Sequence, residues 1–257
     1  MNALTRNKTY FISDCHLGAG YIADRHAHEA RVVRFLDHIK DDAVALFLVG
    51  DILDYWYEYR TVVPRGFVRF LGKLAQLADD GVRITWVTGN HDVWLFDYLR
   101  DEVALTVQHH AGIVEVQGTP FFISHGDDVG KRPLKYRIMK ACFTSRLCQW
   151  LYASVHPRWT HKIATGMSTS NRTNRSPQDE EREKGPAADE LIRYVHQHHS
   201  EHPEVKHYVF GHLHLARLDE LDGVQVVFLG DWIKQDTYAV FDGNQLTLHH
   251  FPDENNA

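Results

Sequence analysis

The sequence predicts an α/β fold in which two β-sheets pack face to face and helices cover their outer surfaces. Short apolar runs typical of buried strands alternate with amphipathic stretches typical of helices through most of the chain. Toward the C-terminus the pattern changes to short strands joined by turns such as 242–244, which favours antiparallel pairing. The 257 residues, 44% of them hydrophobic, predict a single domain over residues 1–257 with a modest insertion.

The individual elements follow from the spacing of their apolar residues. Strands are expected at the short runs of aliphatic and aromatic residues, which are 10–12, 46–49, 84–87, 121–123, 208–210, 224–229, 237–241 and 245–250. Helices are expected where apolar residues recur every three to four positions, at 25–40, 64–80, 92–101, 133–154 and 186–199. This alternation is typical of a layered α/β protein.

Five of the predicted strands end in a polar motif that is rich in metal-type ligands. The motifs are Asp14-Cys15-His16, Gly50-Asp51, Gly89-Asn90-His91-Asp92, Ser124-His125-Gly126-Asp127 and Gly211-His212-Leu213-His214. Because α/β folds place their active sites where strands end, we expect the five motifs to meet. A single histidine of this kind is more often an ordinary surface or core residue, but chance explains five such motifs together poorly.

The types of ligand indicate a pair of divalent cations. Carboxylate, imidazole and amide oxygen without thiolate suit manganese, zinc or iron, whereas calcium or magnesium alone would call for fewer histidines. Seven ligands serve two ions if one ligand is shared, and Asp51 is the natural bridge. We assign one ion to Asp14, His16, Asp51 and His214, and the other to Asp51, Asn90, His125 and His212. Two such ions can activate a water molecule and hold phosphoryl oxygens for displacement at phosphorus.

The ordered motifs DxH, GDxxD, GNHD, HGD and GHLH resemble those of the calcineurin-like metallophosphoesterases at every ligand position. The resemblance implies a four-layer α/β/β/α metallophosphoesterase sandwich. It also implies that His91 is not a principal ligand but lies over the substrate phosphate, with Asp54 orienting its ring. His91 would then stabilise charge or protonate the leaving oxygen.

A basic segment separates the fourth motif from the fifth. Residues 129–178 contain ten Lys or Arg and no Asp or Glu, so the rest of the chain carries a charge of −16 against −6 for the whole. Apolar side chains recur there at helical spacing, including Phe143, Leu147 and Trp150. One interpretation is that these apolar side chains belong to an ordinary helix packed on the core. The other is that they form, together with the basic residues, a surface for a substrate that is both phosphorylated and hydrophobic. We expect residues 128–185 to form a helical insertion, or cap, over the active site.

Within the family, several features are similar to the enzymes that hydrolyse UDP-2,3-diacylglucosamine in lipid A biosynthesis. These are the insertion, a tyrosine eleven positions after the histidine of HGD, and the closing runs 229–232 and 250–252. The similarity implies cleavage of the pyrophosphate bond of a lipid-linked nucleotide sugar, typically with manganese, to give UMP and 2,3-diacylglucosamine 1-phosphate. It also implies a sugar-phosphate cleft lined by Tyr136, Arg132, Asn171 and Arg172.

Two alternatives remain open. The best-known members of that narrower group carry arginine at the position of His91, so the alternative substrate is another phosphodiester or pyrophosphate, such as a dinucleoside polyphosphate or a cyclic nucleotide. The second alternative is a non-catalytic scaffold of the same fold. Such a scaffold would be expected to have lost ligands, whereas all seven are present in this sequence.

The composition also indicates the cellular setting. No run of about 20 apolar residues occurs, and the residues before the first predicted strand leave no room for a signal peptide. Three cysteines, an odd number, favour a reducing compartment. We therefore expect a cytoplasmic protein whose basic, apolar segment makes peripheral contact with the anionic cytoplasmic face of the inner membrane. Nucleic acid is not expected as a partner, because the rest of the chain is acidic and carries no familiar nucleic-acid module.

Overall fold

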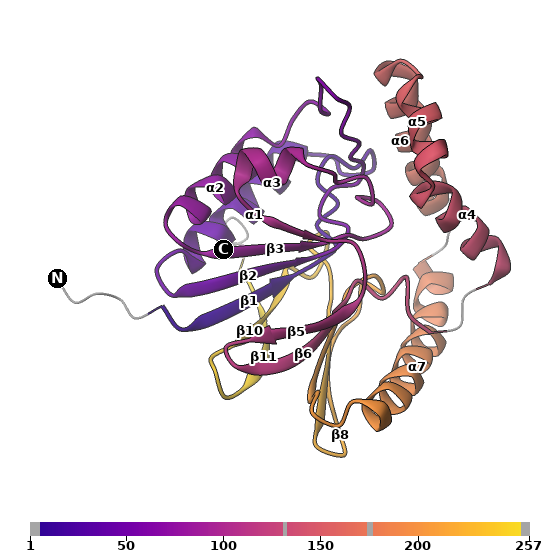
Figure 1. Ribbon diagram of the computed structural model, residues 1–257. Coiled ribbons are helices and arrows are strands. Elements are labelled where there is room, and N and C mark those ends of the chain that lie inside the picture. The colour runs from indigo at the N-terminus through magenta and orange to yellow at the C-terminus, as the bar shows by residue number, and fades with distance from the viewer. Residues whose placement is uncertain (1–5, 131–132, 174–176, 253–257) are drawn as a thin grey trace.

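In the computed structural model, which describes residues 6–130, 133–173 and 177–252, two β-sheets pack face to face (Figure 1). The first sheet has six strands in the spatial order β11 (Leu246–His250), β10 (Thr237–Phe241), β1 (Lys8–Ile12), β2 (Ala43–Val49), β3 (Arg83–Val87) and β4 (Thr106–Gln108). The second sheet has five, in the order β5 (Gly112–Val116), β6 (Thr119–Ser124), β7 (His207–Phe210), β9 (Val224–Leu229) and β8 (Ala216–Leu221).

The strands that precede the polar motifs run parallel within each sheet. β1 pairs with β2 and β2 with β3 in the first sheet, and β6 pairs with β7 in the second, all in parallel. The carboxyl ends of β1, β2 and β3 therefore meet at one edge, on the right in Figure 1. This shared direction brings motifs that are far apart in the sequence to one side of the molecule.

The alternation of side chains along each strand divides them between separate cores. In β1, Phe11 faces the second sheet and stacks on Phe47 and Phe121, with ring centroids 5.2 and 5.8 Å away. Its neighbours Tyr10 and Ile12 face the other way and belong to the core beneath the helices. Because both faces of these strands are buried, their sequences are nearly continuous apolar runs.

Helices cover the outer face of each sheet and complete four layers, α/β/β/α, as predicted. The first sheet is covered by α1 (Arg25–Ile39), α2 (Val68–Asp79) and α3 (Tyr98–Val103). Phe35 of α1 and Phe70 of α2 are fully buried in this core. The second sheet is covered by α7 (Pro177–Glu201), through Leu191 and Val195.

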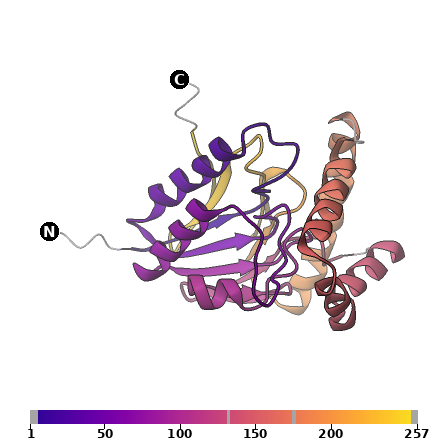
Figure 2. The same ribbon diagram turned by 90° about the horizontal axis from the view of Figure 1, so that it is seen from above.

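Three further helices, which we call the cap helices, project from the edge where the strands end (Figures 1 and 2). They are α4 (Leu134–Thr144), α5 (Arg146–Ala153) and α6 (Pro157–Thr173). They rest on an aromatic cluster formed by Tyr55, Tyr57 and Trp94. The Tyr57 hydroxyl donates to a cap carbonyl, that of Gln149, at 2.7 Å, and Trp94 Nε1 donates to that of Phe143 at 2.9 Å. The loops that carry the GDxxD and GNHD motifs thus also hold the cap.

The helices differ from the sequence prediction at several boundaries. The stretch 133–154 forms two helices because Ser145 adopts an extended conformation (φ −68°, ψ 123°) between them. The stretch 92–101 is helical only from Tyr98, since Asp92 is used in the site described below. α7 begins at Pro177 and contains Pro186, the residue expected to start it, so the predicted cap boundary at 185 falls inside this helix.

The strands were predicted less completely at the sheet edges. β4, β5 and β8 were missed, because edge strands bury little of one face and lack a clear apolar pattern. The antiparallel pairing expected for the C-terminal strands is correct for β10 with β11. It is only partly correct for β9, which is antiparallel to β8 but parallel to β7 in the second sheet. In the described part of the chain, no helix has both the length and the apolar character of a bilayer-crossing segment.

Candidate metal centre

The five polar motifs meet at the edge of the two sheets. Within the described residues, three groups of side chains bring their ligand atoms within 4.8 Å of one another, and all three draw on these motifs. The groups are Asp14, His16 and His214; His16, Asp51 and His91; and Asp51, His125 and His212. His16 and Asp51 each belong to two of the groups, so these two residues connect all three groups into one cluster.

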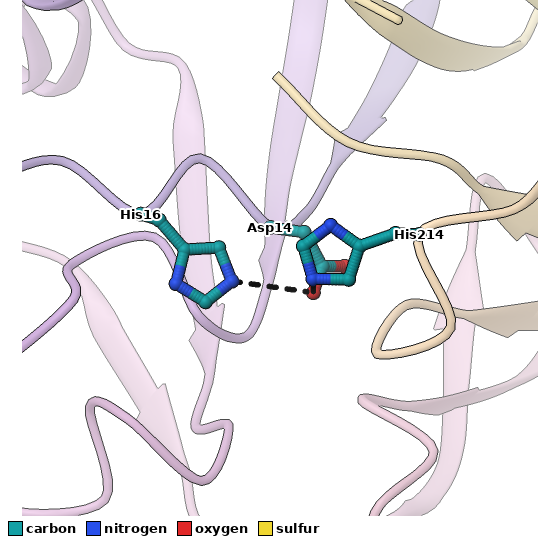
Figure 3. Close-up of side chains that lie close together, drawn as sticks. All are labelled: Asp14, His16 and His214. Carbon is teal, nitrogen blue, oxygen red and sulfur yellow. Dashed lines mark ion pairs between the residues drawn. The ribbon is translucent and has the colours of Figure 1, made fainter. Parts of the chain in front are cut away.

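We call Asp14, His16, Asp51 and His214 the first subsite. His214 Nε2 lies 3.4 Å and His16 Nε2 3.9 Å from the same oxygen, Oδ1 of Asp14 (Figure 3). His16 Nε2 also lies 3.8 Å from Asp51 Oδ2. The two imidazole rings stack with their centroids 5.1 Å apart, so both present a nitrogen to one point.

We call Asp51, Asn90, His125 and His212 the second subsite. His125 Nε2 lies 3.3 Å from Asp51 Oδ2, the oxygen that also faces the first subsite. The other oxygen of Asp51 accepts a hydrogen bond from the backbone N–H of His91 at 2.9 Å. This bond fixes the carboxylate and leaves Oδ2 between the two subsites.

The buried polar atoms at this centre fit a pair of cations. Among the described residues, no hydrogen-bond partner reaches four buried atoms of the predicted ligands: Asp14 Oδ1, His16 Nε2, Asn90 Oδ1 and His125 Nε2. Buried polar atoms are normally paired, because leaving one unpaired costs about 1–3 kcal/mol. A divalent cation coordinated by oxygen and imidazole would satisfy these atoms, so the donor set fits the metal that the sequence predicts.

The pKa shifts of residues at the centre bear on whether it can bind metal ions. Burial alone would raise the pKa of Asp51, but the surrounding histidines, His125 first, hold that pKa well below its ordinary value. Burial and the neighbouring His125 lower the pKa of His212 to about 4, and burial lowers the pKa of His16. For His125 burial acts the same way, but the adjacent Asp51 carboxylate outweighs it and raises the pKa of His125 well above its ordinary value. The ionised Asp51 and the neutral His16 and His212 are in the protonation states that metal ligation needs, whereas His125 would give up a proton when it binds an ion.

The backbone holds most of these ligands in an uncommon conformation. The angle φ lies in the left-handed region at Asp14 (52°), His16 (45°), Asp51 (54°), His212 (68°) and His214 (49°). Each such residue costs on the order of 1 kcal/mol or more, and conformations of this kind cluster at functional sites. The tight turns that follow each strand therefore aim the side chains into the centre at some cost to stability.

Two glycines of the motifs are required by close approach of the chain. A Cβ atom on Gly89 would lie 2.2 Å from Asp51 Oδ1, and one on Gly211 would lie 2.8 Å from Asp14 Oδ2. The glycine before Asn90 and the glycine before His212 thus make room for carboxylates from other motifs.

Residues behind the ligands fix their orientation. His125 Nδ1 donates to the carbonyl of Val49 at 2.9 Å. Asp92 joins two motifs, because it accepts from the backbone N–H of Ile52 (2.9 Å) and of Gly89 (2.7 Å). It caps no helix, because α3 begins only at Tyr98. Burial and the nearby Asp51 raise the pKa of Asp92 to about 6.

With this geometry established, comparison with protein-family models matches residues 8–235 to calcineurin-like phosphoesterase. This chain belongs to the calcineurin-like phosphoesterase family. A curated relative, UDP-2,3-diacylglucosamine hydrolase of Porphyromonas gingivalis, is 42% identical over 96% of this chain and 99% of its own. The protein of the same name from Shewanella baltica is 25% identical over 96% and 98%. A solved archaeal phosphodiesterase aligns over 94% of this chain and 98% of its own, with 14% identity and a TM-score of 0.44.

His91 of this phosphoesterase lies beside Asp51 and His16, and its ligand atom groups with theirs within 4.8 Å. It is a quarter exposed, and its Nε2 lies 4.0 Å from Asp51 Oδ2. Burial lowers the pKa of His91, but the carboxylates of Asp51 and Asp54 outweigh this and raise it above its ordinary value. A histidine that favours its cationic form and faces the centre can stabilise negative charge there.

The contacts of Asp54 in the structure differ in detail from the role expected of it. His91 Nδ1 donates to the backbone carbonyl of Asp54 at 2.9 Å, whereas the carboxylate Oδ1 of Asp54 lies 3.5 Å away. The same Oδ1 lies 3.2 Å from Nδ1 of His16. Asp54 therefore orients His91 chiefly through its main chain, and its side chain orients a ligand of the first subsite.

The residues expected to line the substrate cleft are only partly placed. The hydroxyl of Tyr136 donates to Asp127 at 2.5 Å, and Lys140 Nζ donates to the same carboxylate oxygen at 2.9 Å. Asp127, the acid of HGD, thus joins the centre to α4. Asn171 and Arg172 belong to α6, but their side chains, like the whole of Arg132, lie outside what the structure describes. For all four residues, Tyr136 included, the substrate role stays a prediction.

Proposed function

We propose that this phosphoesterase cleaves the pyrophosphate bond of UDP-2,3-diacylglucosamine, releasing UMP and 2,3-diacylglucosamine 1-phosphate for lipid A biosynthesis. The observation that carries the proposal is the 42% identity to the Porphyromonas gingivalis UDP-2,3-diacylglucosamine hydrolase over nearly the full length of both chains. The clustered ligand set supports it, because function depends on the site and not on the fold alone.

The first and second subsites would each hold one divalent cation, which we propose to be manganese, with zinc or iron as alternatives. When bound, such a pair supplies Lewis-acid charge for the phosphoryl oxygens and makes a water nucleophile available at neutral pH. Asp51 would hold both ions at a fixed separation. The remaining ligands, anchored to the ends of strands from both sheets, would set the orientation of the phosphoryl group for in-line attack.

His91 would act on the leaving group. When water attacks the phosphorus on the uridine side, the departing oxygen belongs to the sugar 1-phosphate, and negative charge collects on it as the bond breaks. A cationic imidazole held by the carbonyl of Asp54 and facing Asp51 stabilises that charge without moving. Because a phosphate leaving group is already acidic, we expect charge stabilisation to matter more than proton transfer.

The cap helices would bind the lipid part of the substrate and the membrane surface. Large apolar side chains are exposed there in a group: Leu134, Ile138, Met139, Leu147, Trp150, Leu151, Trp159 and Ile163. Exposed basic side chains lie among them: Lys135, Arg137, Arg146, Arg158 and Lys162. An apolar surface with basic residues and no acidic ones suits acyl chains next to anionic headgroups. We therefore place the protein at the cytoplasmic face of the inner membrane.

The substrate proposal is tested with purified protein, manganese and detergent-dispersed UDP-2,3-diacylglucosamine. We expect release of UMP and the diacylated sugar 1-phosphate in equal amounts, with the reaction abolished by a chelator. The control substrates are a dinucleoside polyphosphate and a cyclic nucleotide at the same concentration. Rapid turnover of either control without release of UMP from the lipid would contradict the proposal.

The membrane proposal predicts that the exposed tryptophans of the cap bind vesicles. Replacing both Trp150 and Trp159 with glutamate should weaken binding to anionic phosphatidylglycerol vesicles by at least about tenfold, since burying one large apolar side chain contributes about 1.5–3 kcal/mol. Sedimentation with the vesicles measures this. The matched control is Ile113→Glu, which changes an exposed apolar residue on β5 outside the cap. Equal binding by the double variant and the wild type would show that the cap does not contact the membrane.

A further inference from the structure

The turn between β9 and β10 supplies a carboxylate that touches a ligand of the first subsite. Asp231 lies two residues after the end of β9 and is only 2% exposed. Its Oδ2 lies 3.1 Å from Nδ1 of His214, while Nε2 of that histidine faces Asp14 Oδ1 at 3.4 Å. We propose that Asp231 is a positioning residue that orients His214 and thereby sets how tightly the first subsite holds its ion. This inference rests on the metal centre of the proposed function.

The carboxylate of Asp231 is itself held in place. Its Oδ1 accepts hydrogen bonds from the backbone N–H groups of Ile233 (2.9 Å), Lys234 (2.7 Å) and Gln235 (3.3 Å). The side-chain amide of Gln235 donates both to Asp231 Oδ2 (3.2 Å) and to the carbonyl of His214 (2.8 Å). A carboxylate surrounded by donors acts as an acceptor, so the proton of His214 belongs on Nδ1. Its Nε2 lone pair is then directed at the first subsite.

The same turn is fastened to the loop that carries Asp14. The backbone N–H of Trp232 donates to the carbonyl of Asp14 at 3.2 Å, and Arg31 Nη2 donates to the carbonyl of Trp232 at 2.9 Å. Arg31 Nε also forms a 3.0 Å ion pair with Asp236. The Trp232 side chain is fully buried against Phe35, with ring centroids 5.0 Å apart. The turn that carries Asp231 is therefore tied by a backbone hydrogen bond to the loop of Asp14, the ligand that Nε2 of His214 faces.

The second subsite is supported differently. Its histidine His125 is oriented by a neutral backbone carbonyl, that of Val49. A carboxylate partner raises the basicity of a ligating imidazole as well as fixing its ring, and losing such a partner typically costs roughly 10–100-fold in metal affinity. Loss of Asp231 should therefore weaken one ion and leave the other nearly unchanged.

The test is a manganese titration of metal-free protein, followed by calorimetry, for the wild type, Asp231→Ala and Asp231→Asn. We expect two ions per chain in the wild type. In Asp231→Ala, one binding step should weaken by roughly 10–100-fold and the other should keep its affinity. Asp231→Asn should also weaken this step, because its single amide oxygen can accept either from His214 or from the backbone donors of the turn, but not from both.

Asp236→Asn is the matched control. It removes a buried carboxylate from the same turn, one that pairs with Arg31 and not with His214. It should therefore lower thermal stability but weaken either binding step much less than Asp231→Ala does. Unchanged titrations in both folded Asp231 variants would overturn the inference. A loss of manganese affinity in Asp236→Asn equal to that in Asp231→Ala would also overturn it, because the effect would then come from turn stability alone. Fewer than two ions in the wild type would overturn the metal centre itself. Because no substrate is used, an error in the proposed substrate would not change this readout.

Discussion

Replacement of Asp51 with asparagine is expected to abolish turnover and to remove both ions. Oδ2 of Asp51 is the atom that both subsites share, at 3.3 Å from His125 Nε2 and 3.8 Å from His16 Nε2. An amide in its place removes the negative charge between the two cations and leaves their mutual repulsion uncompensated. The loss of affinity at each subsite should exceed the roughly 10–100-fold that removal of an outer-shell partner costs. Metal content after dialysis and UMP release measure the two effects separately.

Glu58→Gln is the control for loss of a buried carboxylate in Asp51→Asn. Glu58 is also buried, but it accepts from Trp56 and from the backbone at the start of α3, away from the ligands. This variant should be less stable yet keep both ions. If Asp51→Asn retained two ions and a substantial rate, Asp51 would not be the bridge.

Replacement of His91 with alanine is expected to slow turnover by on the order of 100-fold or more while both ions stay bound. The side chain contributes a cation beside the reacting phosphate, but its Nε2 lies 4.0 Å from Asp51 Oδ2, farther than Nε2 of His16 or of His125. The turnover number should therefore fall much more than metal content. Single-turnover rates on fully loaded protein, together with metal analysis, separate the two quantities.

His91→Arg distinguishes charge stabilisation from proton transfer. Arginine keeps the positive charge but does not give up a proton at neutral pH, so this variant should retain much more activity than His91→Ala if charge is what matters. Activity as low as in the alanine variant would instead indicate proton transfer. Loss of ions from His91→Ala with an unchanged rate per loaded site would make His91 a ligand.

The positions of the ligands could be predicted from the sequence, because the alternation of strand residues and the parallel pairing of strands determine where each strand ends. Side chains alternate between the two faces of a strand, so Phe11 and Phe47 lie between the sheets. The strands that carry them end at the same sheet edge, where Asp14 and Asp51 follow. Parallel pairing of β1 with β2 then suffices to bring residues from separate motifs together. The four-layer arrangement followed from the same alternation of strands and helices.

The orientation of the ligands could not be predicted in this way. Whether Asp54 meets His91 through its carbonyl or its carboxylate depends on a turn whose residues have positive φ, which composition does not reveal. The contact between His214 and Asp231 joins two separate motifs through the packing of Trp232. The break at Ser145 likewise depends on how the cap lies on Trp94, because periodicity alone continues across it.

The most direct test of the account is anomalous diffraction from crystals of this protein grown with manganese. The account predicts two peaks about 3.5–4 Å apart, one on each side of the Asp51 carboxylate. The first should be surrounded by Asp14, His16 and His214, and the second by Asn90, His125 and His212. A single peak, or two peaks of which only one contacts Asp51, would contradict the shared carboxylate on which the proposed chemistry depends.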